Sequence, residues 1–66
     1  MNISEALAKE IKRSQELLLE YRKIPNGAGF FGAWMIQASV DNAVNALASG
    51  DVIKILEAYE VIKDNE

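Results

Sequence analysis

Two breaks divide the chain into three stretches of helical periodicity, and they constrain its fold more than any other feature. At the first, Ile24-Pro25-Asn26-Gly27, proline disfavours helical backbone in the residue before it, and Asn-Gly is a common turn dipeptide. At the second, Ser49-Gly50-Asp51, glycine suits the left-handed position after a helix, and aspartate suits the N-cap of the next helix. We therefore expect an all-α fold, either a three-helix bundle or a long helical hairpin plus a third helix. We expect one domain, residues 1–66, with helices over about residues 3–23, 30–48 and 52–63.

Each expected helix carries an apolar stripe of the kind that packs into a core. The stripe of the first helix consists of Leu7, Ile11, Ser14, Leu18 and Tyr21, widened by Ile3 and Leu17. That of the second helix consists of Gly32, Ala33, Ile36, Val40, Ala43, Val44 and Leu47. That of the third helix consists of Val52, Ile55, Leu56, Tyr59 and Ile62. Asn2 is the expected N-cap of the first helix, with Glu5 in the position of a capping box. We interpret Ser14 as a polar residue tolerated in its stripe and Ser39 as a small packing residue.

Further apolar residues lie off these stripes, and every helix has at least one: Leu19, Trp34, Met35, Ile53 and Val61. Either these residues belong to the core, or they form a second surface that is buried in a homo-oligomer. A chain of 66 residues is only marginally stable on its own. It contains no cysteine and no histidine, so disulfides and the usual zinc ligands are excluded as stabilising devices. We therefore expect a homo-oligomer that is built on helix faces.

The charge and hydropathy patterns exclude several classes of partner. The net charge of -3 argues against binding to a nucleic acid duplex, because duplex affinity depends on basic residues. The most apolar stretch, from Phe30 to Ile36, is far shorter than a membrane span, and the first residues do not resemble a signal peptide. We expect a cytoplasmic protein that does not bind membranes. Five of the seven basic residues lie in residues 1–26, so this segment is the expected place for an anion.

The connection between the first two helices is the candidate ligand-binding site. It brings together basic, amide-bearing, glycine and aromatic residues: Arg22, Lys23, Asn26, Gly27, Gly29, Phe30, Phe31 and Trp34. Glycines permit close backbone approach, a helix N-terminus attracts anions, and aromatic rings stack on flat ligands. The segment is neither a P-loop nor a dinucleotide fingerprint. In the alternative interpretation, the glycines serve a tight helix connection, Arg22 is solvated or salt-bridged, and the two phenylalanines close the end of the core.

We expect no enzymatic activity, no catalytic residue, no cofactor and no metal site. No histidine is present to activate a serine, and a lysine base would need burial that the pattern does not indicate. The pairs Glu16/Glu20 and Asp41/Asn45 have the spacing of neighbours on a helix face, but too few carboxylates accompany them for a metal site.

Residues 21–63 contain four short motifs: Tyr21-x-x-Ile24-Pro25-x-Gly27, Phe31-Gly32-Ala33-x-Met35-Ile36, Ala46-Leu47-Ala48-Ser49-Gly50-Asp51-Val52 and Ala58-Tyr59-Glu60. In these motifs the chain resembles small uncharacterised helical accessory proteins of phages and prophages. That family has no established catalytic residues. Phe30, Phe31 and Trp34 depart from its commoner pattern. The resemblance implies a phage accessory protein that binds and neutralises a component of the host, such as a defence protein or its nucleotide signal.

Two functions fit these observations. In the first, an oligomeric binding protein sequesters a phosphorylated nucleotide-type signal and so counters host defence. Arg22, Lys23 and the amides of residues 27–29 hold the phosphate in this hypothesis, and Phe30, Phe31 or Trp34 stacks on the base. In the second, the protein is an inhibitor or adaptor without a small ligand. Its off-stripe apolar residues and acidic C-terminal half dock on a basic host protein.

Overall fold

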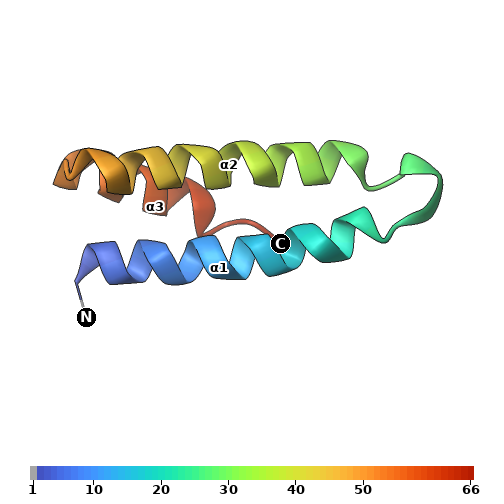
Figure 1. Cartoon of the computed structure of the whole chain (residues 1–66), viewed down its shortest axis with the longest axis horizontal. Helices are drawn as coiled ribbons and strands as arrows, with labels where there is room; N and C mark the ends of the chain where they lie inside the picture. The colour runs from blue at the N-terminus through green and yellow to red at the C-terminus, as the bar shows by residue number, and fades with distance from the viewer. Residues whose placement is uncertain (1) are drawn as a thin grey trace.

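The chain folds into three α-helices, and the computed structural model describes residues 2–66 (Figure 1). Helices α1 (Ile3–Arg22) and α2 (Phe30–Ser49) form an antiparallel hairpin, and α3 (Val52–Ile62) folds back against both. A short turn, η1 (Pro25–Gly27), connects α1 to α2. The expected all-α three-helix bundle is confirmed. Each predicted helix end agrees with the structure to within one residue: α1 ends at Arg22, α2 continues to Ser49, and α3 ends at Ile62.

The predicted caps set these boundaries. The Asn2 side chain accepts a hydrogen bond from the Glu5 backbone N–H at 2.9 Å, which satisfies one free donor at the start of α1. At the start of α3, the Asp51 side chain accepts a hydrogen bond from the Ile53 backbone N–H at 2.9 Å. Gly50 ends α2 in the left-handed conformation, with φ 70°.

The first break in the sequence is a tight turn with two left-handed residues. Asn26 has φ 62° and ψ 23°, Gly27 has φ 70°, and the Ala28 N–H donates to the Pro25 carbonyl at 3.3 Å. Positive φ at both central positions is the signature of a type I′ turn, for which Asn-Gly is a preferred sequence. The Asn-Gly turn predicted from the sequence is therefore confirmed.

The core contains most of the predicted stripe residues but not all of them. Leu7, Ile11, Ser14 and Leu18 of α1 are buried, as predicted, and Tyr21 is half-buried. Three residues that we placed in stripes are exposed instead: Val44, Val52 and Leu56. The alanines Ala46 and Ala58 are buried in their place. Small side chains let neighbouring helices approach closely, so alanines share the contact line of α2 and α3 with larger apolar residues.

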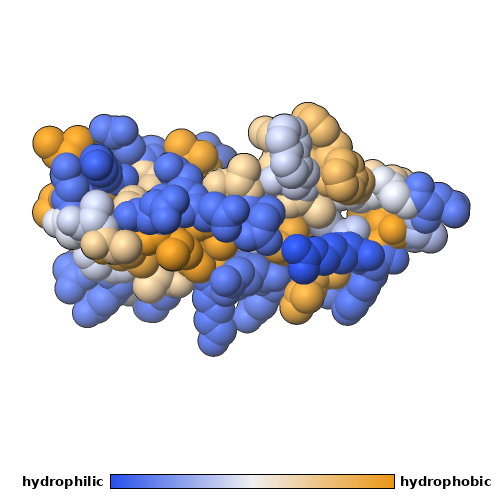
Figure 2. Space-filling model, turned by 45° about the horizontal axis from the view of Figure 1, so that its top comes forward, coloured by the Kyte–Doolittle hydropathy of each residue, from blue (hydrophilic) through white to orange (hydrophobic). Residues whose placement is uncertain are grey.

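The off-stripe apolar residues are all exposed in the single chain: Leu19, Trp34, Met35, Ile53 and Val61. The interpretation that they belong to the core is therefore wrong. Figure 2 shows hydrophobic side chains raised above the surface over the half of α2 that lies nearest the turn.

A network of hydrogen bonds ties the residues after α3 to the other two helices. The Arg13 guanidinium donates to the backbone oxygens of Ile62 at 3.2 Å, Lys63 at 3.2 Å and Asn65 at 2.7 Å. These include carbonyls that a helix C-terminus leaves without partners. A single arginine on α1 thus closes the end of α3.

Asn65 completes this network from within the bundle. Its side-chain amide donates to the hydroxyl of Ser14 at 3.1 Å and to that of Ser39 at 2.7 Å. Ser14 is fully buried. Our interpretation of the two serines as merely tolerated or space-filling is therefore wrong, because together they hold Asn65.

The helices differ in length, and this leaves one end of the bundle incomplete. Helices α1 and α2 have 20 residues each, whereas α3 has 11 and packs along the half far from the turn (Figure 1). The molecule measures 40 × 18 × 17 Å, so the hairpin extends well past α3. We call residues 21–35 the hairpin end. Within residues 2–66, no helix is both long enough and apolar enough to span a bilayer.

Candidate functional site

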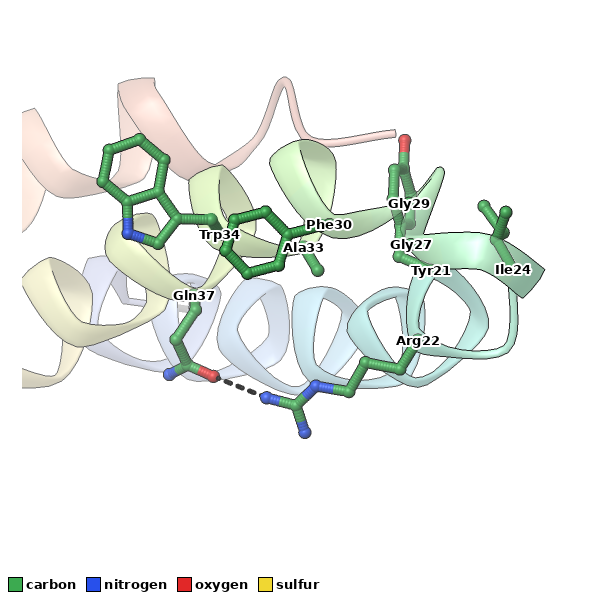
Figure 3. A pocket seen from close by; sticks show the side chains of 9 residues that line it. All are labelled: Tyr21, Arg22, Ile24, Gly27, Gly29, Phe30, Ala33, Trp34 and Gln37. Carbon is green, nitrogen blue, oxygen red and sulfur yellow. Dashed lines mark hydrogen bonds between the residues drawn. The ribbon is translucent and has the colours of Figure 1, made fainter.

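An open pocket of about 430 Å³ lies at the hairpin end (Figure 3). It is lined by residues from α1, the turn and α2: Tyr21, Arg22, Ile24, Gly27, Gly29, Phe30, Ala33, Trp34 and Gln37. Its volume falls within the range of small-molecule sites.

One face of α2 forms one wall of the pocket. Phe30, Ala33, Trp34 and Gln37 follow each other at the i, i+3, i+4, i+7 spacing that places residues on one side of a helix. The Phe30 side chain is 72% exposed and that of Trp34 is 60% exposed. Large aromatic rings normally contribute much of their area to a core or an interface. Here two of them stand at the rim of a cavity and leave their faces accessible.

The opposite wall comes from the end of α1 and contributes Arg22, the only charged residue that lines the pocket in the described part of the chain. The Arg22 guanidinium reaches toward α2 and donates to the Gln37 side-chain oxygen at 3.4 Å (Figure 3). This bond is long for an N–H···O contact and lies at the surface, so it holds the guanidinium only weakly. Because the lining residues include no carboxylate, the electrostatic character of the pocket is set by the positive charge of Arg22.

The glycines position the backbone of this site. A side chain at Gly29 would place its Cβ 2.3 Å from the Tyr21 carbonyl oxygen, and one at Gly32 would lie 2.2 Å from the Tyr21 ring. Gly27 has open space around it, but its φ of 70° favours glycine. Tight connection and close packing therefore account for the glycines, as in the structural alternative that we described for them.

The structure brings together five of the eight predicted site residues around the pocket: Arg22, Gly27, Gly29, Phe30 and Trp34. The other three do not line it. Lys23 pairs with the Glu20 carboxylate at 3.4 Å, and Asn26 is a central residue of the turn. Phe31 lies on the next face of α2, with its ring centroid 6.1 Å from that of Trp34.

One detail of the predicted site and one detail of its structural alternative are wrong. The Ala28 amide is not free for a ligand, because it donates to the Pro25 carbonyl within the turn. Phe30 and Phe31 do not close the end of the core, because both rings are largely exposed.

Sequence reasoning did not select four lining residues: Tyr21, Ile24, Ala33 and Gln37. A signal for Ala33 and Gln37 was present, because they share the helical face of Phe30 and Trp34. Tyr21 was assigned to the core stripe, and its ring indeed packs on Gly32 while it also forms the back of the pocket.

The pocket is lined by aromatic, aliphatic and amide side chains, by two glycines and by one guanidinium group. Within the described residues, no group of three or more carboxylates, histidines or cysteines is arranged to hold a metal ion. The pKa of Lys63 is raised, because its ammonium donates a hydrogen bond to Glu60 and is stabilised by the negative charge of that carboxylate. This pair lies at the end of α3, outside the pocket lining.

Together, the fold and the site define a three-helix bundle with an open pocket of aromatic rings and one arginine at its two-helix end. No family model, curated protein or solved structure matches the chain.

Proposed function

We propose that this chain is a small, non-enzymatic, oligomeric binding protein that takes an anionic ligand with a flat ring into the pocket at the hairpin end. A phosphorylated nucleotide is the ligand class that fits this description best. One observation carries the proposal: two exposed aromatic rings border the same cavity as an arginine that, within residues 2–66, forms no ion pair with a carboxylate.

The two ligand parts find different partners in the pocket. A base or a similar ring can stack on Phe30 or Trp34, and such stacking is worth about 1–3 kcal/mol per base. The phosphate can replace Gln37 as the partner of Arg22, since a guanidinium binds phosphate through two parallel hydrogen bonds. No side chain caps the N-terminus of α2, so the positive end of its dipole adds to the attraction.

The resemblance to phage accessory proteins suggests a biological setting for this binding. In that setting, the protein acts in the cytoplasm of an infected cell and lowers the free concentration of a nucleotide signal on which host defence depends. Binding alone suffices for this role, so no catalytic group is required.

Trp34 provides a direct test of the proposed ligand, because it is the single tryptophan of the chain and lines the pocket. We expect cyclic or linear nucleotides to change its fluorescence and to release or absorb heat in calorimetric titration. The Arg22→Ala variant should bind at least about tenfold more weakly, because it loses a charge-assisted contact. Its melting temperature should stay close to that of the unmodified chain, because Arg22 is exposed.

Lys12→Ala is the matched control for this titration. Lys12 is an exposed cation on α1, and the variant changes the net charge by the same amount. We expect it to bind as the unmodified chain does. A broad nucleotide panel without heat or fluorescence change, or equal weakening in both variants, would contradict the proposal.

We infer that a second copy of the chain covers the uncovered side of the hairpin end. Phe31, Met35 and Ser39 follow each other at i, i+4, i+8, so they form one row along α2. Asn65 covers the row at Ser39, to which its side-chain amide donates a hydrogen bond. Phe31 and Met35 lie closer to the turn, where Asn65 does not reach, and both are exposed. Two hairpin ends packed along this row would form a four-helix arrangement and bury both pairs of side chains.

Size-exclusion chromatography with light scattering tests this self-association. We expect a molar mass that is a multiple of 7.3 kDa, and we expect Met35→Glu to shift it toward 7.3 kDa, because a buried unpaired charge opposes the contact. Leu19→Glu is the matched control, since Leu19 is equally exposed but lies on α1. A mass of 7.3 kDa for the unmodified chain at all concentrations would rule out the second copy.

A further inference from the structure

The net charge of the chain is concentrated in α3 and its flanking residues. Residues 1–50 contain five acidic and five basic side chains and are therefore neutral. Residues 51–66 contain five acidic and two basic side chains, so they carry the whole net charge of -3. The acidic residues are Asp51, Glu57, Glu60, Asp64 and Glu66.

The same helix exposes apolar side chains on the face that points away from the bundle. Ile55, Ala58 and Ile62 are buried against the other helices. On the opposite side lie four residues that we call the α3 outer face: Ile53, Leu56, Glu57 and Glu60. Ile53 is 67% exposed and Leu56 is 45% exposed. Apolar and acidic side chains thus share one surface at i, i+3, i+4, i+7 spacing.

A polar groove of about 360 Å³ runs beside this face, between α2 and α3. It is lined by Asn42, Asn45, Ala46, Ser49, Lys54 and Glu57. Among residues 2–66, no cation lies within ion-pair distance of Glu57. A lysine or arginine beside Glu57 would find a carboxylate together with amide and hydroxyl oxygens, in a groove to which Lys54 contributes one positive charge.

We propose that the α3 outer face and its groove dock an amphipathic basic helix of another protein. Leucine-like side chains of that helix cover Ile53 and Leu56, and its lysines or arginines pair with Glu57 and Glu60. The surface differs from the pocket at the hairpin end, so the inference does not depend on the proposed ligand.

The charge selects this partner over the other possible occupants. A nucleic acid or an anionic membrane would be repelled by residues 51–66, which carry a net charge of -3. Two α3 outer faces of this chain would repel each other for the same reason, so a symmetric contact between two α3 helices is not favoured. A basic partner removes the repulsion and covers the apolar side chains.

A peptide binding experiment with the full chain tests the inference. The probe is a labelled peptide of about 18 residues built from leucine and lysine. Its leucines lie on one face of a helix and its lysines on the other, and its length is chosen because shorter helices are marginal in water. We expect it to bind in fluorescence anisotropy and to weaken at least about tenfold between low and high salt. In NMR spectra, the amide shifts should concentrate on residues 52–61 and on the groove.

Two peptides and two protein variants provide the controls. A peptide with glutamate in place of lysine and a scrambled leucine–lysine peptide should bind much more weakly. Glu57→Lys/Glu60→Lys should weaken binding of the basic peptide at least about tenfold. Glu16→Lys/Glu20→Lys is the matched control, because it changes the net charge by the same amount. Each double variant also breaks one i, i+3 ion pair, Glu20–Lys23 in the control and Glu60–Lys63 in the first variant. The control should leave the affinity for the basic peptide within about twofold.

Each other outcome overturns the inference. Equal weakening by both charge reversals would show that only the net charge matters, and shifts confined to the hairpin end would place the peptide elsewhere. If the first variant does not fold, Glu57→Gln/Glu60→Gln, compared with Glu16→Gln/Glu20→Gln, gives the same comparison. No binding of the basic peptide at low salt also overturns the inference.

Discussion

Replacing Gly29 with alanine is expected to lower the free energy of unfolding by about 3 kcal/mol, at the upper end of the usual cost of overpacking. The new Cβ would lie 2.3 Å from the Tyr21 carbonyl oxygen, which is backbone and cannot rotate away. Either the end of α1 or the start of α2 must move. A domain of this size has a total stability of about 3–10 kcal/mol, so the variant is expected to lose between about a third and all of it.

The other glycines separate this steric effect from backbone strain. Gly29 has φ -89°, which alanine adopts readily, so the substitution tests the clash alone. Gly27→Ala and Gly50→Ala test backbone strain without a clash, because both positions have φ 70° and nothing lies within 4 Å of an added Cβ. We expect each to cost about 1–2 kcal/mol. Urea unfolding followed by circular dichroism measures all three, and a Gly29→Ala cost no larger than the other two would contradict the close contact.

Replacing Arg13 with alanine is expected to lower the free energy of unfolding by about 2–3 kcal/mol, since hydrogen bonds to a charged group are worth more than neutral ones. The variant loses the donors to the backbone oxygens of Ile62, Lys63 and Asn65. The last turn of α3 and the residues after it should then exchange their amide hydrogens faster.

Lys12→Ala is the control, because Lys12 is the neighbouring exposed cation and its loss changes the net charge equally. We expect it to change stability by less than about 0.5 kcal/mol. Hydrogen exchange followed by NMR distinguishes the local from the global effect. Unchanged protection at the end of α3 in Arg13→Ala would show that the arginine does not hold this segment.

The sequence was most informative where a local rule decides the structure. The caps formed by Asn2, Gly50 and Asp51, and the Asn26-Gly27 turn, depend on residues that are close in the chain. For the same reason, the three helices could be predicted to within one residue at each end. The stripe of α1 could be predicted because Leu7, Ile11 and Leu18, which are buried, are large apolar residues at helical spacing.

Features that depend on distant residues could not be predicted in this way. Asn65 contacts Ser14 and Ser39, which lie 51 and 26 positions away, and nothing in their local sequence indicates the pairing. On α3, we predicted Val52 and Leu56 to be buried because they are large and apolar. The helices approach each other at Ala58 instead, so that residue is buried. The site shows the same division, since Phe30 and Trp34 stand out in the sequence, whereas Tyr21 and Gln37 line the pocket only because α1 and α2 meet there.

Tyr21 links the pocket to the residues after α3. Its ring forms the back of the pocket and lies against Gly32, while its hydroxyl donates to the backbone oxygen of Glu66. A molecule that displaces the ring must therefore also break its hydrogen bond to Glu66. By thermodynamic reciprocity, a molecule that holds Glu66 against Tyr21 lowers the affinity of the pocket for such a ligand by the same factor by which the ligand lowers the affinity for that molecule.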